Sequence, residues 1–295
     1  MSDTVESRSR WLVVLLSLVP IWLVMSAGVA VWWSMRGDDK QEEERQQRFA
    51  MEMSVERITE DLRKLGKMVG ERHTRDETSQ RNLTRAAAMI EGILGPSNTG
   101  YQVERIVAPK EWPIFRVSLP ADDEAPQIWV VVPYDSPRNR DTALSDSALA
   151  SFIATAQALA KDQLKSTLHF LLVPHGHEAE SPITDTLKRA QTLMDAPASV
   201  FVIGPMGTSP ELLCITSNAK SPSARALGEL GIISEATTSM NEPVNSYQLL
   251  DLPIVWVSTR RTGSDSDAIE ANHIAISTGK LVEWLRRTAR LEAAD

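Results

Sequence analysis

The longest run of hydrophobic positions in the chain covers residues 11–33, which contain no Asp, Glu, Lys or Arg. At a rise of about 1.5 Å per residue, a helix of this length crosses the roughly 30 Å hydrocarbon core of a bilayer. Trp11 lies at one end of the run, and Trp32 and Trp33 lie at the other, where aromatic side chains favour the membrane interface. The pattern therefore predicts one transmembrane helix with the lipid bilayer as its partner.

The flanks of this run are polar: residues 1–10 form an N-terminal tail and residues 34–50 a juxtamembrane stalk. A cleavable signal peptide is the alternative interpretation, because residues 28–30 (Gly-Val-Ala) resemble a cleavage site. The apolar run is longer than the core of a typical signal peptide, which favours an uncleaved anchor. Basic residues occur on both sides of the run, so the positive-inside rule does not orient the chain.

A second pattern begins after the stalk, where apolar residues recur at spacings of four and three. They are Met51, Val55, Ile58, Leu62, Leu65 and Val69. This spacing is typical of a helix with one apolar face. We expect that face to pack on the domain that follows; a short coiled-coil dimer is the alternative, although so few heptads are marginal for one.

The remainder of the 51–295 region alternates short apolar runs with longer amphipathic stretches. Strands are expected at 101–107, 112–119, 127–132, 168–173, 200–203 and 254–258, and helices near 78–94, 146–162, 182–194, 222–230 and 273–291. Strands separated by helices of this length favour a largely parallel sheet covered on both faces. The predicted fold class is α/β, with a mixed, mostly parallel sheet flanked by helices and preceded by one transmembrane helix.

Composition and charge narrow the function classes. Hydrophobic residues make up 42% of the chain and charged residues 24%, which is ordinary for a globular protein. A formal net charge of −8 is a poor match for a phosphate backbone, so no nucleic-acid partner is expected. The single cysteine, Cys214, lies in an apolar run and is expected to be a buried strand residue. An Asn-Leu-Thr glycosylation sequon begins at Asn82.

In a sheet of this kind, ligands bind at the carboxyl ends of the strands. Four loops are therefore candidates for a functional site: 133–146, 174–178, 204–207 and 259–267. They contain carboxylates, histidines and arginines, which are the residue types that bind metals or anionic and cationic ligands.

These segments resemble the di-zinc aminopeptidases, a clan that includes glutamate carboxypeptidase and bacterial aminopeptidases. The apolar strand at 128–132 with Pro-Tyr-Asp-Ser at 133–136 is similar to the strand of that family that ends in His-Tyr-Asp-Ser. Ser-Asp-Ser-Ala at 145–148 is similar to its Asp-Asn-x-Ser turn, and Gly-Glu-Arg at 70–72 to its early Gly-x-Arg. The strands at 167–173 and 252–255 are similar as well. The resemblance runs from about Val55 onward and implies a zinc aminopeptidase-like fold.

The family holds two zinc ions with two histidines, a bridging aspartate, a glutamate and a further aspartate, and a second glutamate is its general base. The corresponding positions here are degenerate: Pro133 and Arg261 stand at the two histidine positions, Asp146 at the bridging aspartate and Pro205 at the further aspartate, while Asp135 matches the residue that orients the first histidine. The glutamate pair falls at Gly176 and His177, or at His177 and Glu178 after a one-residue shift. Only Asp146 and Glu178 keep a ligand of the family's type, and zinc sites need three or four ligands. The resemblance thus implies a pseudopeptidase with no catalytic residue and no cofactor, which uses its fold to bind a protein or peptide.

The alternative is a membrane-bound, zinc-dependent aminopeptidase-like hydrolase with a rebuilt metal site, formed by His175, His177, Glu178 and Asp146. A serine hydrolase based on Ser136 is disfavoured, because no Gly-x-Ser-x-Gly elbow occurs. The family's domains mostly work outside the cytoplasm. This analogy implies a single-pass membrane protein whose soluble domain is extracytoplasmic.

Without zinc, Asp135 and Asp146 need another way to balance their charge. Arginine stays charged and suits a carboxylate. We expect Arg261, or Arg260 in its place, to point into the old metal cleft and to pair with one of these carboxylates. Arg138 and Arg140, which follow Asp135 closely, are further candidates.

Overall fold

The structure is a computed structural model, and the ranges that it describes are 22, 25–29, 32, 53–106, 112–120, 125–138, 142–160, 162, 164–177, 183–193, 197–216, 230, 233–235, 252–259 and 268–291. The chain divides into two compact units, Met1–Arg48 and Phe49–Asp295. The predicted transmembrane helix lies largely outside the described residues, although residues 25–29 are helical. Within the described ranges, no helix combines the length and the apolar character that a membrane span requires.

One mixed sheet forms the centre of the second unit. Its described part has 8 strands in the order β1-β2-β4-β3-β5-β8-β6-β7. Their bounds are β1 Val103–Ile106, β2 Ile114–Leu119, β3 Gln127–Pro133, β4 Thr167–Val173, β5 Ser199–Ile203, β6 Leu212–Thr216, β7 Ile233–Glu235 and β8 Ile254–Thr259. Strands β4, β3, β5 and β8 run parallel, whereas β1, β2 and β6 join through antiparallel pairings. The predicted mixed, mostly parallel α/β sheet is therefore confirmed.

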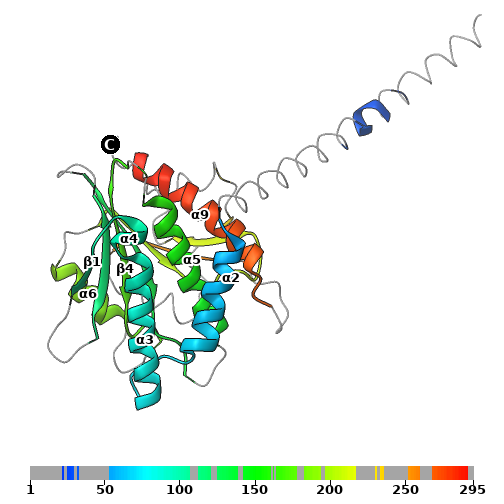
Figure 1. Ribbon diagram of the computed structural model, residues 1–295. Helices are drawn as coiled ribbons and strands as arrows, with labels where there is room; N and C mark the ends of the chain where they lie inside the picture. The colour runs from blue at the N-terminus through cyan, green and yellow to red at the C-terminus, as the bar shows by residue number, and fades with distance from the viewer. Residues whose placement is uncertain are drawn as a thin grey trace, which may run out of the picture. The chain divides into compact units, whose positions relative to one another are not determined.

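Helices cover both faces of this sheet (Figure 1). Their bounds are α2 Val55–Arg63, η1 Lys64–Val69, α3 Glu77–Leu94, α4 Pro96–Thr99, α5 Ala143–Leu159, α6 Ile183–Leu193 and α9 Ala271–Leu291. Side chains cap two of the starts: Ser54 Oγ accepts from Arg57 N, and Asp76 Oδ1 accepts from Ser79 N at 2.9 Å. The expected helices near 78–94 and 273–291 are confirmed, and α5 starts slightly before the expected residue 146.

Successive residues of each strand face opposite sides of the sheet, so the structure has two hydrophobic cores. One face of the sheet, with Phe115, Val130 and Phe170, packs under α2, α3, α5 and α9. The opposite face, with Trp129 and Val131, packs against Leu187 and Ala190 of α6. The strands are thus buried on both sides, which explains why their sequences are nearly continuous apolar runs rather than alternating ones.

The expected continuous helix over 51–69 is instead an α-helix followed by the π-helix η1, which ends where Gly70 N donates to Leu65 O at 2.7 Å. Gly70 has a φ of 77°, a backbone conformation that suits glycine. The predicted apolar stripe does pack on the domain, because Ile58, Leu65 and Val69 are buried and α2 contacts α5 and α9. The expected helix at 222–230 lies outside the described residues except for its last residue, Leu230, which is buried.

Candidate functional site

The loops after β3 and β4 meet at the carboxyl edge of the sheet, as expected for parallel neighbours. Tyr134 N donates to Val173 O at 3.0 Å, which holds the two strand ends together. The Asp135 carboxylate is fully buried and accepts two backbone amides of the other loop, Gly176 N at 2.8 Å and His177 N at 2.9 Å. Asp135 and His177 are therefore neighbours. Their contact is through the backbone amide of His177, so Asp135 holds the backbone of the loop after β4.

Pro133, which the resemblance places at a zinc-histidine position, is in direct contact with Gly176, which one of the two alignments places in the glutamate pair. A Cβ atom added at Gly176 would lie 2.2 Å from Pro133 Cβ and 2.3 Å from Pro133 Cγ. Carbon atoms in contact are normally about 3.5–4.0 Å apart, so no side chain fits at residue 176 unless the backbone moves. The proline ring thus packs against the backbone of residue 176 and supplies no side-chain ligand atom.

Asp146, in the first turn of α5, is paired with an arginine that the sequence analysis did not single out as its partner. Arg72 Nη2 lies 2.7 Å from Asp146 Oδ1, and both side chains are almost completely excluded from solvent. The contact is an ion pair whose angle falls outside hydrogen-bond geometry. The other carboxylate oxygen, Asp146 Oδ2, accepts from Thr142 Oγ1 at 2.9 Å.

Arg72 makes further contacts with neighbouring segments. Its Nε donates to Tyr134 O at 3.0 Å, its Nη1 to Gly70 O at 3.0 Å, and its Nη2 approaches Ser145 Oγ at 3.5 Å. These acceptors belong to the end of η1, the loop after β3 and the start of α5. A single guanidinium therefore joins three elements that are distant in sequence.

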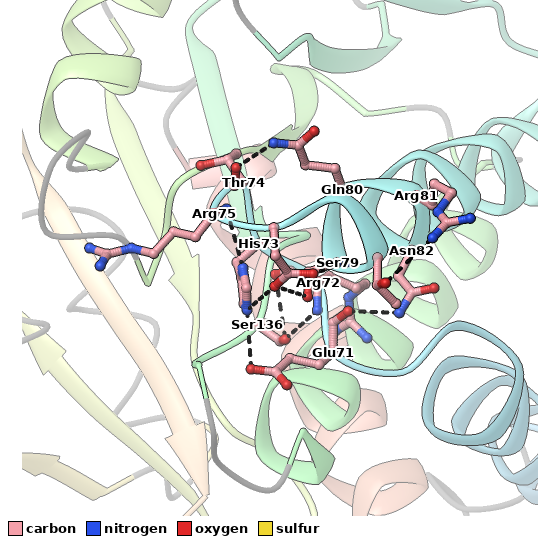
Figure 2. Close-up of polar contacts among 12 residues, drawn as sticks. Glu71, Arg72, His73, Thr74, Arg75, Ser79, Gln80, Arg81, Asn82 and Ser136 are labelled. Carbon is pink, nitrogen blue, oxygen red and sulfur yellow. Dashed lines mark hydrogen bonds and ion pairs between the residues drawn. The ribbon is translucent and has the colours of Figure 1, made fainter.

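The backbone of Arg72 is hydrogen-bonded to the loop after β3 (Figure 2). Arg72 N donates to Ser136 Oγ at 2.8 Å, and Ser136 N donates to Arg72 O at 2.7 Å. The hydroxyl of Ser136 is thus buried and bound to backbone, which does not suit a nucleophile. Asn82 Nδ2 donates to Glu71 O at 3.0 Å and is partly buried, so the sequon asparagine ties α3 to this segment.

Of the arginines proposed from sequence, only Arg138 lies within the described residues. Arg138 is exposed, and within the described part of the chain it makes no ion pair with Asp135 or Asp146. Arg140, Arg260 and Arg261 lie outside the described residues, so their pairing stays a prediction. The sequence does contain a motif that marks Arg72: Gly-Glu-Arg at 70–72, directly after a predicted helix that ends in glycine.

The loop after β5 holds Pro205, the second position assigned to a zinc aspartate. Its carbonyl accepts from Thr259 N at 3.1 Å, and the following amide, Met206 N, donates to Ser147 Oγ at 3.0 Å. Ser147 and Met206 are fully buried. This loop is therefore bound to β8 and α5 through its own backbone.

The two histidines of the β4 loop differ in environment. His175 is buried at 9% exposure and has a φ of 65°, a left-handed conformation that is uncommon for a residue other than glycine. His177 is exposed, and Glu178 lies outside the described residues. The structure therefore places His175 and His177 on one loop beside Asp135, and it leaves the full rebuilt metal site with Glu178 as a prediction.

The described donor set does not fit a two-zinc centre. Pro133 and Pro205 have no ligand atom, Gly176 has no side chain, and Asp146 already faces a cation. Among the described residues, no group of three or more His, Cys, Asp or Glu side chains is placed to hold a metal ion. Zinc sites require three or four such ligands in closed geometry.

No protein-family model and no curated protein matches this sequence. Solved structures do match. The LapA aminopeptidase of Legionella pneumophila superposes with a TM-score of 0.63 at 12% identity, over 84% of this chain and 74% of that chain. The aminopeptidase PepT of Bacillus cereus gives 0.58 at 9% identity, over 81% and 100% of the two chains.

A glutaminyl cyclase of Macrostomum lignano gives a TM-score of 0.58 at 10% identity, over 82% of this chain and 92% of that chain. Identities this low establish the fold and nothing finer. The expected mixed α/β sheet flanked by helices is nevertheless confirmed. The chain therefore shares the zinc aminopeptidase-like fold of aminopeptidases and glutaminyl cyclases.

Proposed function

We propose that this chain is a membrane-anchored pseudopeptidase, a metal-independent module that uses an aminopeptidase-like fold to bind a protein or peptide. The observation that carries the proposal is the contact between Pro133 and Gly176, where a Cβ atom would lie 2.2 Å from the proline ring. By the resemblance, in the alignment that places Gly176 in the glutamate pair, these are two ligand positions of the family, and their packing against each other supports the proposal. Restoring a ligand at residue 176 requires displacement of residue 133, so the site does not regain a metal by a single substitution.

The other strand-end groups support the same interpretation. Both oxygens of the Asp135 carboxylate accept backbone amides, and the Pro205 loop is held by Thr259 and Ser147. These hydrogen bonds hold the loops through their own backbone. A fold whose strand ends are packed, and whose ligand positions hold other residues, suits a binding role. The fold alone does not specify catalysis, because function depends on the residues of the site.

The test uses the full-length protein in detergent, with metal analysis and hydrolysis of aminoacyl anilides. We expect no stoichiometric zinc and no hydrolysis, with or without added zinc, because too few ligands are present. Hydrolysis that zinc restores and a chelator abolishes would instead establish the aminopeptidase-like hydrolase. In that case His177→Ala and Glu178→Ala should abolish the rate, whereas an exposed substitution such as Arg138→Met should leave it unchanged.

The membrane anchor is a separate part of the proposal. Residues 11–33 carry no charge and have tryptophans at both ends, which supports an uncleaved transmembrane helix. By family analogy the domain that follows is extracytoplasmic. Alkaline extraction should leave the full-length protein in the membrane fraction, and N-terminal sequencing should find no cleavage after residue 30. A mature chain that starts at Val31 would refute the anchor.

A further inference from the structure

Helix α2 carries a carboxyl group on its apolar face. Its two buried residues are Ile58, at 2% exposure, and Asp61, at 6%. They lie three residues apart and the buried Leu65 follows four residues later, so the three side chains share one face. That face packs on the domain, because α2 contacts α5 and α9 (Figure 1). Asp61 therefore interrupts an apolar stripe at an interface between helices.

Within the described part of the chain, no hydrogen bond or ion pair reaches the Asp61 carboxylate. Two cations act on it from a distance, Arg57 and Lys64, but both contact other groups. Arg57 Nη1 donates to Gln157 Oε1 of α5 at 3.1 Å, and Lys64 Nζ lies 3.6 Å from Glu60 Oε1. A buried carboxyl group without donors or a paired cation is more stable in its neutral form.

The elements packed against α2 bring no compensating charge to Asp61. Besides Lys64, η1 has only Lys67, which is exposed. The only acidic or basic residue of α5 is Asp146, which is paired with Arg72. None of the charged or titratable side chains of α9 acts on Asp61; they are His273, Lys280, Glu283, Arg286, Arg287 and Arg290.

Burial is the largest influence on this carboxyl group and raises the pKa of Asp61, whereas Lys64 and Arg57 partly offset the effect and Glu60 adds to it. When α2 is detached and hydrated, the ordinary aspartate pKa of about 3.9 applies. The docked helix therefore binds the proton more tightly than the detached helix does. By linkage, protonation of Asp61 favours the docked helix to the same extent.

We propose that Asp61 is a pH-sensitive latch for α2: its protonated form favours the packing of α2 on α5 and α9, and its ionised form weakens that packing. α2 is the first described helix of the second unit, and η1 and the Gly-Glu-Arg segment at 70–72 follow it directly. In sequence, the latch thus lies between the expected juxtamembrane stalk and the candidate site. The inference goes beyond the proposed function and does not depend on it, because its test reads helix docking rather than hydrolysis or metal content.

The direction of the pH effect follows from the raised pKa of the docked carboxyl group. The stabilising contribution of the proton is fully present below about pH 3.9, where the docked and detached forms are both protonated. As the pH rises, the docking equilibrium weakens by up to about tenfold per pH unit, until the docked carboxyl group is ionised as well. α2 is therefore held more tightly in acid than at neutral pH.

The experiment compares hydrogen exchange of the α2 backbone amides in the wild type and in Asp61→Asn. Both proteins are full-length in detergent, and each rate is divided by the intrinsic rate of the unfolded amide. Asparagine keeps the shape of aspartic acid but does not ionise. At about pH 8, α2 should be more protected in Asp61→Asn than in the wild type, by about tenfold for each unit that burial raises the pKa. Near pH 4 the two proteins should agree, and the ratio between them cancels the titration of every other group.

Glu56→Gln is the matched control, because it makes the same acid-to-amide change at an exposed position in the first turn of the same helix. This variant should keep the wild-type pH profile. The amides of α3 report on the rest of the domain and should respond to Asp61→Asn less than those of α2. Asp61→Ala is a second neutral variant; its packing differs, but its α2 amides should lose the same pH dependence.

Three results would overturn the inference. The first is an α2 pH profile in Asp61→Asn and Asp61→Ala that matches the wild type. The second is wild-type protection of α2 at about pH 8 that equals or exceeds that of Asp61→Asn. The third is an equal response of α2 and α3, which would place the effect in global unfolding of the domain rather than in the docking of one helix.

Discussion

Replacing Gly176 by alanine is expected to destabilise the domain by about 3 kcal/mol, because the new methyl group meets a rigid ring. The added Cβ would lie 2.2 Å from Pro133 Cβ and 2.3 Å from Pro133 Cγ. Relief of this overlap requires a shift of more than about 1 Å, given the normal separation between carbon atoms. Gly176 is not among the described glycines with positive φ, so the cost is steric rather than conformational.

Overpacking of a buried site costs about 1–3 kcal/mol, and the upper end applies because both clashing atoms belong to one ring at the end of a buried strand. In a domain of this size, 3 kcal/mol corresponds to a fall in Tm of about 6–12 °C. Thermal and urea unfolding of the full-length protein in detergent would measure both quantities.

Gly92 provides the matched control, since a Cβ atom added there meets nothing within 4 Å and the residue lies inside α3. Gly92→Ala should therefore stabilise the protein by about 0.5–1 kcal/mol. In a Pro133→Gly background the cost of Gly176→Ala should fall below about 1 kcal/mol. A Gly176→Ala variant as stable as wild type, or a cost that persists in that background, would refute the reasoning.

Three further predictions concern buried groups. Ser147→Ala removes the acceptor of Met206 N, 3.0 Å away, and should cost about 1–3 kcal/mol in urea unfolding; a loss below about 0.5 kcal/mol would contradict this. Burial raises the pKa of Cys214, so its thiol should react with Ellman's reagent only after unfolding. Burial, with a smaller contribution from Asp135, also raises the pKa of Tyr134, whose hydroxyl donates to Pro113 O at 2.9 Å. The unfolded chain then releases this proton first, so stability should fall as the pH rises above about 10. Tyr134→Phe should flatten that part of the profile, and an unchanged slope would count against it.

Much of the architecture was predictable from the sequence. The apolar runs that became β3 and β4 and the amphipathic stretches that became α3 and α9 lie close to their expected bounds. Strand and helix periodicities depend on near neighbours along the chain, so they are visible without a structure. The same reasoning named the strand-end loops, because parallel strands bring their carboxyl ends to one edge.

Local patterns predicted one continuous helix before Gly70, and only the tertiary structure showed the π-helix that leads into Arg72. The partner of Asp146 and the contact between Pro133 and Gly176 were also decided by folding. These contacts join residues that are far apart in sequence, and their geometry follows from strand order, register and the packing of α5 against the sheet. Hydrophobic periodicity specifies which face of an element is buried, but it does not specify which distant loop that element meets.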